Sequence, residues 1–202
     1  RHLDGLRAEA RQVQRQRRDG DALADHLRKH AQRHRQQRAR PRRNRKSESV
    51  RKMVRETIVT PSNFIYPLFI HDEDSNVAIA SMPGCERHSL KSMLAEAKDA
   101  WQYGVRSFVL FPKVDDNLKS NRGEEAYNPS GIVPRAVSML KEALPDSIVC
   151  TDVALDPYSS MGHDGIVEDG KILNDDTIEQ LCKQSVMQAR AGSDVIANPN
   201  PN

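Results

Sequence analysis

The sequence has few of the residues that build disulfide frameworks or large aromatic cores. Its 202 residues include 3 cysteines, 1 tryptophan and only 4% aromatic residues. An odd number of cysteines without C-x-x-C spacing argues against a disulfide scaffold and against a zinc finger. We therefore expect Cys150 and Cys182, which fall in apolar patterns, to be core residues in a reducing compartment.

Long apolar runs and phosphate-binding glycine motifs are also missing. No run approaches the roughly 20 apolar residues that a helix needs to cross a bilayer, so no membrane partner is expected. No expected strand is followed by G-x-G-x-x-G or G-x-x-x-x-G-K-[ST], which disfavours a Rossmann or P-loop nucleotide site.

Positive charge is concentrated in the first part of the chain. The formal net charge is +3, and residues 1–45 are dominated by Arg, Gln, His and Ala. We interpret residues 1–39 as a basic, disordered extension or as mis-annotated sequence. The alternative is an arm that binds RNA or DNA, because clustered arginines attract phosphate, but nucleic acid is the less favoured partner. A transit peptide fits poorly, since this segment lacks Ser and contains acidic residues.

From residue 63 onward, short apolar runs alternate with segments of helical spacing. The runs predict strands over residues 64–70, 106–111, 147–153 and 195–197. The helical spacing predicts helices over residues 89–101, 131–144 and 175–191. This alternation is typical of βαβ units, so we expect an α/β fold with a parallel sheet.

Local signals refine the ends and positions of these elements. Ser89 and Asn174 are the expected N-caps of two helices, and Gly104 and Gly192 are the expected stops. Pro67 lacks a backbone donor, so its strand is expected at an outer or irregular position. On the last helix, the expected core-facing residues are Ile178, Leu181, Cys182, Val186 and Ala189.

Ionisable residues gather directly after the third expected strand. The stretch from Thr151 to Gly165 reads TDVALDPYSSMGHDG and contains Asp152, Asp156 and Asp164. Parallel α/β enzymes place their sites at the carboxyl ends of strands. Such carboxylates can bind Mg²⁺ or Mn²⁺, act as a general base, or orient a substrate ammonium. A loop of N-caps and Asx turns without a ligand remains an equal alternative at this point.

Several long motifs, in order, resemble the porphobilinogen synthase (delta-aminolevulinic acid dehydratase) family. They are RPRRNRKS (40–47), NFIYPLFIHD (63–72), FPKVDDNLKS (111–120), GEEAYNPSGIVPRA (123–136) and the acidic stretch that begins at residue 151. The resemblance covers residues 40–197 and is strongest to the plant and algal form. It implies a (β/α)8 TIM barrel, of which this sequence would be the N-terminal half only.

The resemblance also implies a domain organisation, partners and a location. Residues 40–62 would be an extended or helical N-terminal arm that embraces a neighbouring subunit in an octamer. Residues 63–197 would form the partial barrel, and residues 198–202 would be a divergent tail. The family condenses two molecules of 5-aminolevulinate to porphobilinogen for haem and chlorophyll synthesis, and the plant-like form implies the chloroplast stroma.

The resemblance assigns roles to the acidic residues. Asp152 matches the catalytic aspartate that binds the substrate amino group. Ala154, Asp156 and Asp164 stand where zinc-dependent members have three cysteines, so the resemblance implies Mg²⁺ and not zinc. Asp156 and Asp164 would either bind this cation weakly or simply line the pocket. Met161 replaces an aspartate of the plant-like pattern, which removes an oxygen ligand.

The two Schiff-base lysines of the family have no counterpart in this sequence. Lys113 ends an expected strand but matches neither of them. The family pattern also diverges after Ala197, so we expect this polypeptide to be catalytically incomplete and inactive by itself. The alternatives are a non-catalytic truncated subunit that docks through its arm, and a basic-armed nucleic-acid-binding or scaffold protein.

Overall fold

The computed structural model describes residue 25, residues 27–29 and residues 40–197. The chain divides into two units, Arg1–Ile58 and Val59–Asn202. In the first unit, a short 3-10 helix, η1 (Arg43–Arg45), precedes helix α2 (Glu48–Met53). Ser47 caps α2, because its hydroxyl accepts a hydrogen bond from the Val50 backbone N–H at 3.3 Å. The interpretations of residues 1–39 and 198–202 lie almost wholly outside the described residues.

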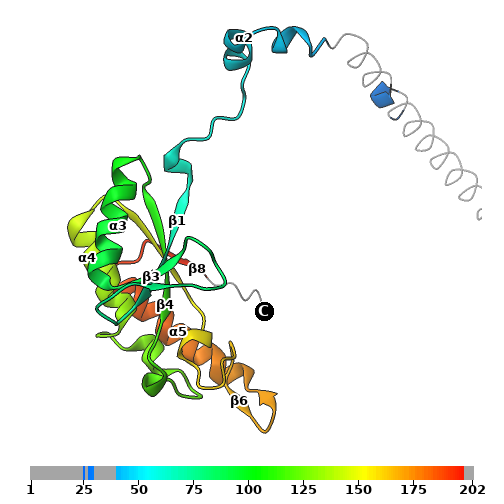
Figure 1. The fold of residues 1–202 in the computed structure, drawn as a ribbon. Coiled ribbons are helices and arrows are strands. Elements are labelled where there is room, and N and C mark those ends of the chain that lie inside the picture. Colours follow the sequence, from blue (N-terminus) through cyan, green and yellow to red (C-terminus); the bar gives the residue numbers. More distant parts are fainter. Residues whose placement is uncertain (1–24, 26, 30–39, 198–202) are drawn as a thin grey trace, which may run out of the picture. The chain divides into compact units, whose positions relative to one another are not determined.

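The second unit is built on a six-stranded sheet with the order β2-β3-β1-β4-β5-β8 (Figure 1). Strands β1 (Ile65–His71), β4 (Ser107–Lys113), β5 (Ile148–Asp152) and β8 (Val195–Ala197) are parallel. These are the four strands that the apolar runs predict. The sequence did not predict β2 (Val77–Ala78) and β3 (Glu86–His88), which pair with each other antiparallel, nor a small hairpin of β6 (Val167–Glu168) and β7 (Lys171–Ile172).

Three helices follow strands of this sheet, as predicted. They are α3 (Leu90–Gln102), α4 (Ile132–Ala143) and α5 (Asn174–Ala191). Ser89 is the N-cap of α3, and its hydroxyl accepts from the Ser92 N–H at 3.2 Å. The prediction for Asn174 is wrong: it is the first residue of α5, and Leu173 takes the cap position without a side-chain bond. Gly104 and Gly192 end their helices at φ values of 95° and 104°, which only glycine adopts readily.

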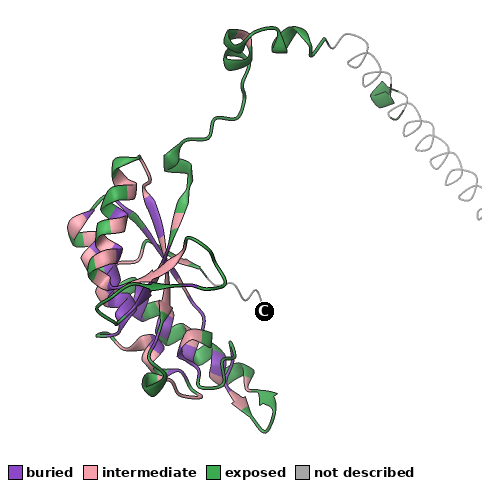
Figure 2. Ribbon diagram, viewed as in Figure 1, coloured by how far each residue is buried: buried purple, intermediate pink, exposed green. Residues whose placement is uncertain are grey.

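The main core lies between the sheet and helices α3 and α4. Alternate strand residues point into it, including Leu68 and Ile70 of β1 and Phe108 and Leu110 of β4, and all four are fully buried. Figure 2 shows buried residues on the sheet and on the helix faces turned toward it. The alternate residues Phe69 and Phe111 point the other way, because successive side chains of a strand face opposite sides. Their rings stack with centroids 5.5 Å apart.

The position of β1 contradicts the outer placement predicted from Pro67 and agrees with the irregular one. Strand β1 lies inside the sheet, between β3 and β4, and not at an outer position. However, β3 pairs only with Phe69 and Ile70, whereas β4 pairs along the whole of β1. The missing N–H of Pro67 therefore breaks no bond to β3, and this explains how a proline is tolerated within the sheet.

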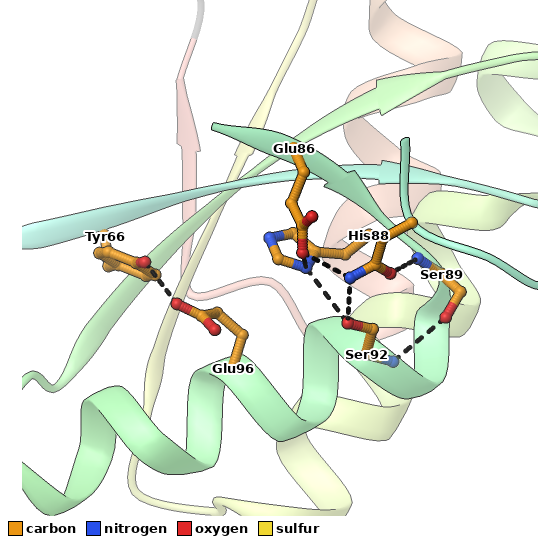
Figure 3. Close-up of polar contacts among 7 residues, drawn as sticks. Tyr66, Glu86, His88, Ser89, Ser92 and Glu96 are labelled. Atoms are coloured by element: carbon orange, nitrogen blue, oxygen red, sulfur yellow. Dashed lines mark hydrogen bonds and ion pairs between the residues drawn. The ribbon is translucent and has the colours of Figure 1, made fainter. Parts of the chain in front are cut away.

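Polar contacts fasten the β2-β3 hairpin to the start of α3 (Figure 3). Asn76 donates from Nδ2 to Glu86 Oε1 at 2.5 Å and to Ser92 Oγ at 2.8 Å. Its Oδ1 accepts from the Ser89 N–H at 3.2 Å. Strand β1 is joined to the same helix by the Tyr66 hydroxyl, which donates to Glu96 Oε1 at 2.6 Å. That bond, with burial, raises the pKa of Tyr66 to about 12.

The core predicts a position-dependent loss of stability. Leu110→Ala empties a fully buried site on β4, so we expect the free energy of unfolding to fall by about 2–5 kcal/mol. Ile148→Ala removes a side chain that is 44% exposed and is expected to cost less than about 1 kcal/mol. Urea unfolding followed by the fluorescence of Trp101, the single tryptophan, measures both. Equal losses for the two variants would contradict this placement of the core.

Candidate active site

The carboxyl ends of β1, β4 and β5 meet at one edge of the sheet. His71, the last residue of β1, is the register partner of Lys113, the last residue of β4, and β5 ends nearby at Asp152. A pocket of about 290 Å³ opens beside these ends. Its wall includes Phe69, Phe111, Lys113, Lys119, Asp152 and Asp156. Aromatic surface, basic groups and carboxylates thus share one small cavity.

Asp152 reaches the pocket because of strand geometry. Asp152 and Ala154 both line it, as residues two apart along an extended chain share a face. Partial burial raises the pKa of Asp152, and the Asp164 carboxylate raises it further, although a hydrogen bond from the Val153 backbone opposes both effects. A carboxyl group with a raised pKa at the end of a strand is typical of a group that exchanges protons.

The other two predicted site residues lie close enough to interact with Asp152. Burial raises the pKa of Asp156, and so do the neighbouring Asp164 and Asp152 carboxylates. Asp164 lines a second cavity, of about 430 Å³, together with His163. The structure therefore brings Asp152, Asp156 and Asp164 into one electrostatic neighbourhood. His163 is exposed, and its Nδ1 accepts a hydrogen bond from the Gly165 N–H at 3.1 Å. This nitrogen therefore has a local structural partner within its own turn.

The acidic loop is held in place by the loop that follows β4. Asp156 starts a short 3-10 helix, η5 (Asp156–Tyr158), and the Tyr158 side chain is buried. The backbone of Ser120 donates to the Tyr158 carbonyl at 3.2 Å and accepts from the Ser160 N–H at 3.0 Å. Because these bonds join two strand-end loops, Asp156 is fixed against the pocket wall.

The donor set can be compared with the metals expected from the sequence. Within the described residues, no group of three or more His, Cys, Asp or Glu side chains has the geometry of a metal site. Zinc, which prefers closed sets of nitrogen and sulfur ligands, does not fit the side chains of Ala154, Asp156 and Asp164, which offer neither. Magnesium keeps several waters and often binds through one or two carboxylates, so the Asp156–Asp164 pair fits a hydrated Mg²⁺. Met161 is 63% exposed and supplies no oxygen ligand.

Helix α5 turns a different face toward the sheet from the one predicted. The predicted core face is largely exposed: Ile178 is 45% exposed, Val186 is 49% exposed, and Cys182 is exposed rather than buried. The expectation for Cys150 is confirmed, since it is buried in β5. The residues of α5 that face inward are mostly glutamines, namely Gln180, Gln184 and Gln188. Sequence reasoning missed them because glutamine is usually a solvent-exposed helix residue.

A parallel α/β sheet with carboxylates gathered at the carboxyl ends of its strands is the architecture of an α/β-barrel enzyme. Comparison with known proteins identifies the family. The family model described as delta-aminolevulinic acid dehydratase matches residues 38–200, and the chain belongs to this family. No helix in the described part of the chain is long and apolar enough to pass through a bilayer.

Named relatives and a solved structure agree with this assignment. The chain is 56% identical to the chloroplastic delta-aminolevulinic acid dehydratase of Physcomitrium patens over 163 residues, which is 78% of this chain and 37% of that relative. The chloroplastic protein of Glycine max is also 56% identical, with 39% of its length covered. A crystal structure of the Toxoplasma gondii ME49 enzyme with the reaction product porphobilinogen matches with a TM-score of 0.76 and 57% identity, over 80% of this chain and 47% of that one.

These comparisons confirm the predicted family and fold class. They also show that the chain spans less than half the length of the curated relatives it matches, as the covered shares of 37% to 41% indicate. The described sheet therefore corresponds to part of the barrel of the matched structure, since the match covers 47% of that chain.

The raised pKa of Asp152 predicts a pH-dependent stability effect. A carboxyl whose folded-state pKa is raised stabilises the fold below its ordinary pKa of about 4, and that stabilisation is lost as the pH rises through the folded value. Asp152→Asn should therefore raise the melting temperature at pH 7, and the gain should shrink toward pH 4. Asp116→Asn is the matched control, because the Lys119 side chain lowers the pKa of Asp116. A gain at pH 7 for Asp116→Asn, or none for Asp152→Asn, would contradict the assignment.

Proposed function

We propose that the protein containing this chain is a porphobilinogen synthase, which condenses two molecules of 5-aminolevulinate to porphobilinogen with loss of water. The observation that carries the proposal is Asp152, which stands in a pocket at the carboxyl edge of the sheet. It does so in a chain more than half identical to named dehydratases. The expected products feed haem and chlorophyll synthesis.

The charges of the pocket suit this substrate. 5-Aminolevulinate carries an ammonium group at one end and a carboxylate at the other. Asp152 offers negative charge to the ammonium, and Lys113 and Lys119 on the same wall offer positive charge to the carboxylate. The stacked rings of Phe69 and Phe111 supply apolar surface for the carbon chain between these ends.

In this proposal Asp152 binds the substrate ammonium and accepts its proton. A free amine is the nucleophile in a condensation with a ketone, so the ammonium has to be deprotonated before carbon–nitrogen bond formation. A carboxylate with a raised pKa is a better proton acceptor than an ordinary aspartate, because its basicity lies closer to the working pH. The Asp152 carboxylate thus attracts the ammonium by its charge, and its partial burial raises its pKa, so that it accepts the proton more readily.

Asp156 and Asp164 are the residues that would hold Mg²⁺. When bound, the cation would neutralise the clustered negative charge beside Asp152 and order its water ligands. The structural support is the effect of the Asp164 and Asp152 carboxylates on Asp156: both raise its pKa, so negative charge is concentrated at this point. Replacement of either should therefore weaken the affinity for Mg²⁺ while leaving the core intact.

Covalent activation of the ketone is assigned to residues beyond the matched segment. The family forms Schiff bases on two lysines, and no lysine of this sequence corresponds to them. Lys113 pairs loosely with Glu73 at 3.9 Å and stands at the pocket rim. We propose that residues 40–197 hold the amine-binding half of the active site and do not turn over alone.

The remaining proposals concern location and assembly. Relatives with about 56% identity are named as chloroplastic proteins, which supports a plastid location for this protein. The arm of residues 40–62 carries apolar side chains such as Met53, which is 78% exposed, and Ile58, which is 70% exposed. Exposed apolar side chains on an arm support self-association with neighbouring subunits, up to the octamer of the family.

A hybrid enzyme tests the function directly. Residues 38–197 replace the matching segment of the Physcomitrium patens relative, and porphobilinogen formation is assayed with 5-aminolevulinate and Mg²⁺. The hybrid should turn over, and Asp152→Asn should lower kcat by about 10²- to 10⁴-fold, the range for loss of a general base. Asp146→Asn, which changes an exposed carboxylate in the turn before β5, should stay within about twofold.

Two results would oppose the proposal. One is a folded hybrid without turnover, or one in which Asp152→Asn keeps most of its activity. The other is porphobilinogen formation by residues 40–197 alone, because this would remove the need for residues beyond the matched segment.

The metal assignment has its own test in the same hybrid. Asp156→Asn and Asp164→Asn should each raise the dissociation constant for Mg²⁺ by about 10-fold, since each removes one charged ligand of a weak site. Titration calorimetry measures this constant. Asp115→Asn, which changes an exposed cap of a neighbouring loop, is the matched control. Unchanged Mg²⁺ binding in both site variants would remove these residues from the metal site.

A further inference from the structure

Three glutamines form a buried row on helix α5. Gln180, Gln184 and Gln188 are spaced one turn apart and are 4%, 0% and 1% exposed. A helix face that packs on a sheet is normally apolar, and glutamine is rarely buried without a partner. Burying an amide is unfavourable unless it forms hydrogen bonds, so the contacts of this row show what it does.

Two of the glutamines bind the main chain at the end of β5. Gln188 donates from Nε2 to the Asp152 carbonyl at 2.7 Å. Gln184 donates from Nε2 to the Ala154 carbonyl at 3.1 Å and lies 3.5 Å from the Asp152 carbonyl. The Oε1 of Gln188 also accepts from the Thr151 hydroxyl at 3.0 Å. Three positions at the end of β5, residues 151, 152 and 154, are thus linked to α5 through residues 184 and 188.

These bonds begin where β4 stops pairing with β5. Strand β4 pairs with β5 only as far as Thr151. Beyond that residue the chain is bound on the β8 side, where Val153 donates to the Ala197 carbonyl at 2.8 Å. The amides of α5 supply donors to carbonyls that have no β4 partner, so residues 152–154 are held from a second direction.

The anchored carbonyls belong to the residues that line the pocket. Asp152 and Ala154 both contribute to its wall. Fixing the peptide units on either side of Val153 sets the direction in which the Asp152 side chain leaves the backbone. Gln180 differs from its neighbours because, among the described residues, it makes no bond to the end of β5. The buried Oε1 atoms of Gln180 and Gln184 both lack a hydrogen-bond partner in the described part of the chain, so the Gln184 amide acts through its Nε2 donor.

We propose that Gln184 and Gln188 are positioning residues of the reaction, which hold the Asp152 main chain so that its carboxylate meets the substrate ammonium. This inference rests on the proposed function of Asp152. At these two helix positions, amide donors replace apolar side chains, and their acceptors lie at the end of β5 that carries the reacting carboxylate. Neither glutamine touches the pocket itself, so their effect passes through the backbone.

The experiment uses the hybrid enzyme with Gln184→Met and Gln188→Met, because methionine matches glutamine in length and has no donor. Each variant should lower kcat by about 10- to 100-fold, the cost of displacing a reacting group by about 1 Å, while KM stays within about threefold. Gln180→Met, the matched control on the same buried face, should keep kcat within about twofold. Melting temperatures of all three variants are measured alongside.

The outcomes separate this inference from the proposed function. If Asp152→Asn retains activity, the proposed function fails and the positioning role fails with it. If Asp152→Asn is inactive while Gln184→Met and Gln188→Met keep the wild-type kcat, only the positioning role is overturned. The same holds if either methionine variant fails to fold while Gln180→Met folds, because the amides would then stabilise the fold itself. A loss of kcat with an intact fold and an unchanged control supports the proposal.

Discussion

The parallel hydrogen-bond ladder between β4 and β5 is the constraint on which the rest of the structure depends. Its register fixes which residues of each strand face the helices and which face the pocket, since side chains alternate along a strand. A shift by one residue would send Phe108 and Leu110 toward the pocket and Phe111 into the core. The pairing with β4 ends at Thr151, and the site begins at the next residue, Asp152, which only β8 still pairs.

The site gathers groups whose charges work against stability. The Asp164 carboxylate raises the pKa of Asp152 and of Asp156, Asp152 also raises the pKa of Asp156, and partial burial raises both values further. A fold selected for stability alone would place such carboxylates apart or pair them with cations, as it does with Lys141 and Asp194, whose atoms are 2.9 Å apart. A cluster of carboxylates at the end of a strand is instead expected where a bound cation, either a metal or a substrate ammonium, neutralises their negative charge.

The sequence predicted the parts of the fold that local pattern controls. The four parallel strands and helices α3 and α4 follow from apolar spacing, and Ser89 and Gly192 act as expected because caps and stops are local chemistry. The acidic residues were found for a similar reason, since they follow a strand directly. The predicted face of α5 was wrong because Ile178 and Val186 were taken as core residues and the glutamines as surface residues. Only the tertiary position of the β5 carbonyls explains the opposite arrangement.

Half of β1 remains without a neighbour on one side in the described part of the sheet. Strand β3 pairs only with Phe69 and Ile70, so residues 65–68 of β1, which include Pro67, have an open edge on that side. An incoming parallel strand can bind this edge without dismantling any existing ladder. Because Pro67 has no backbone N–H, the incoming strand cannot accept a hydrogen bond at this position. A register that needs no donor from residue 67 is therefore favoured, so the proline would help to set the register of any strand that pairs here.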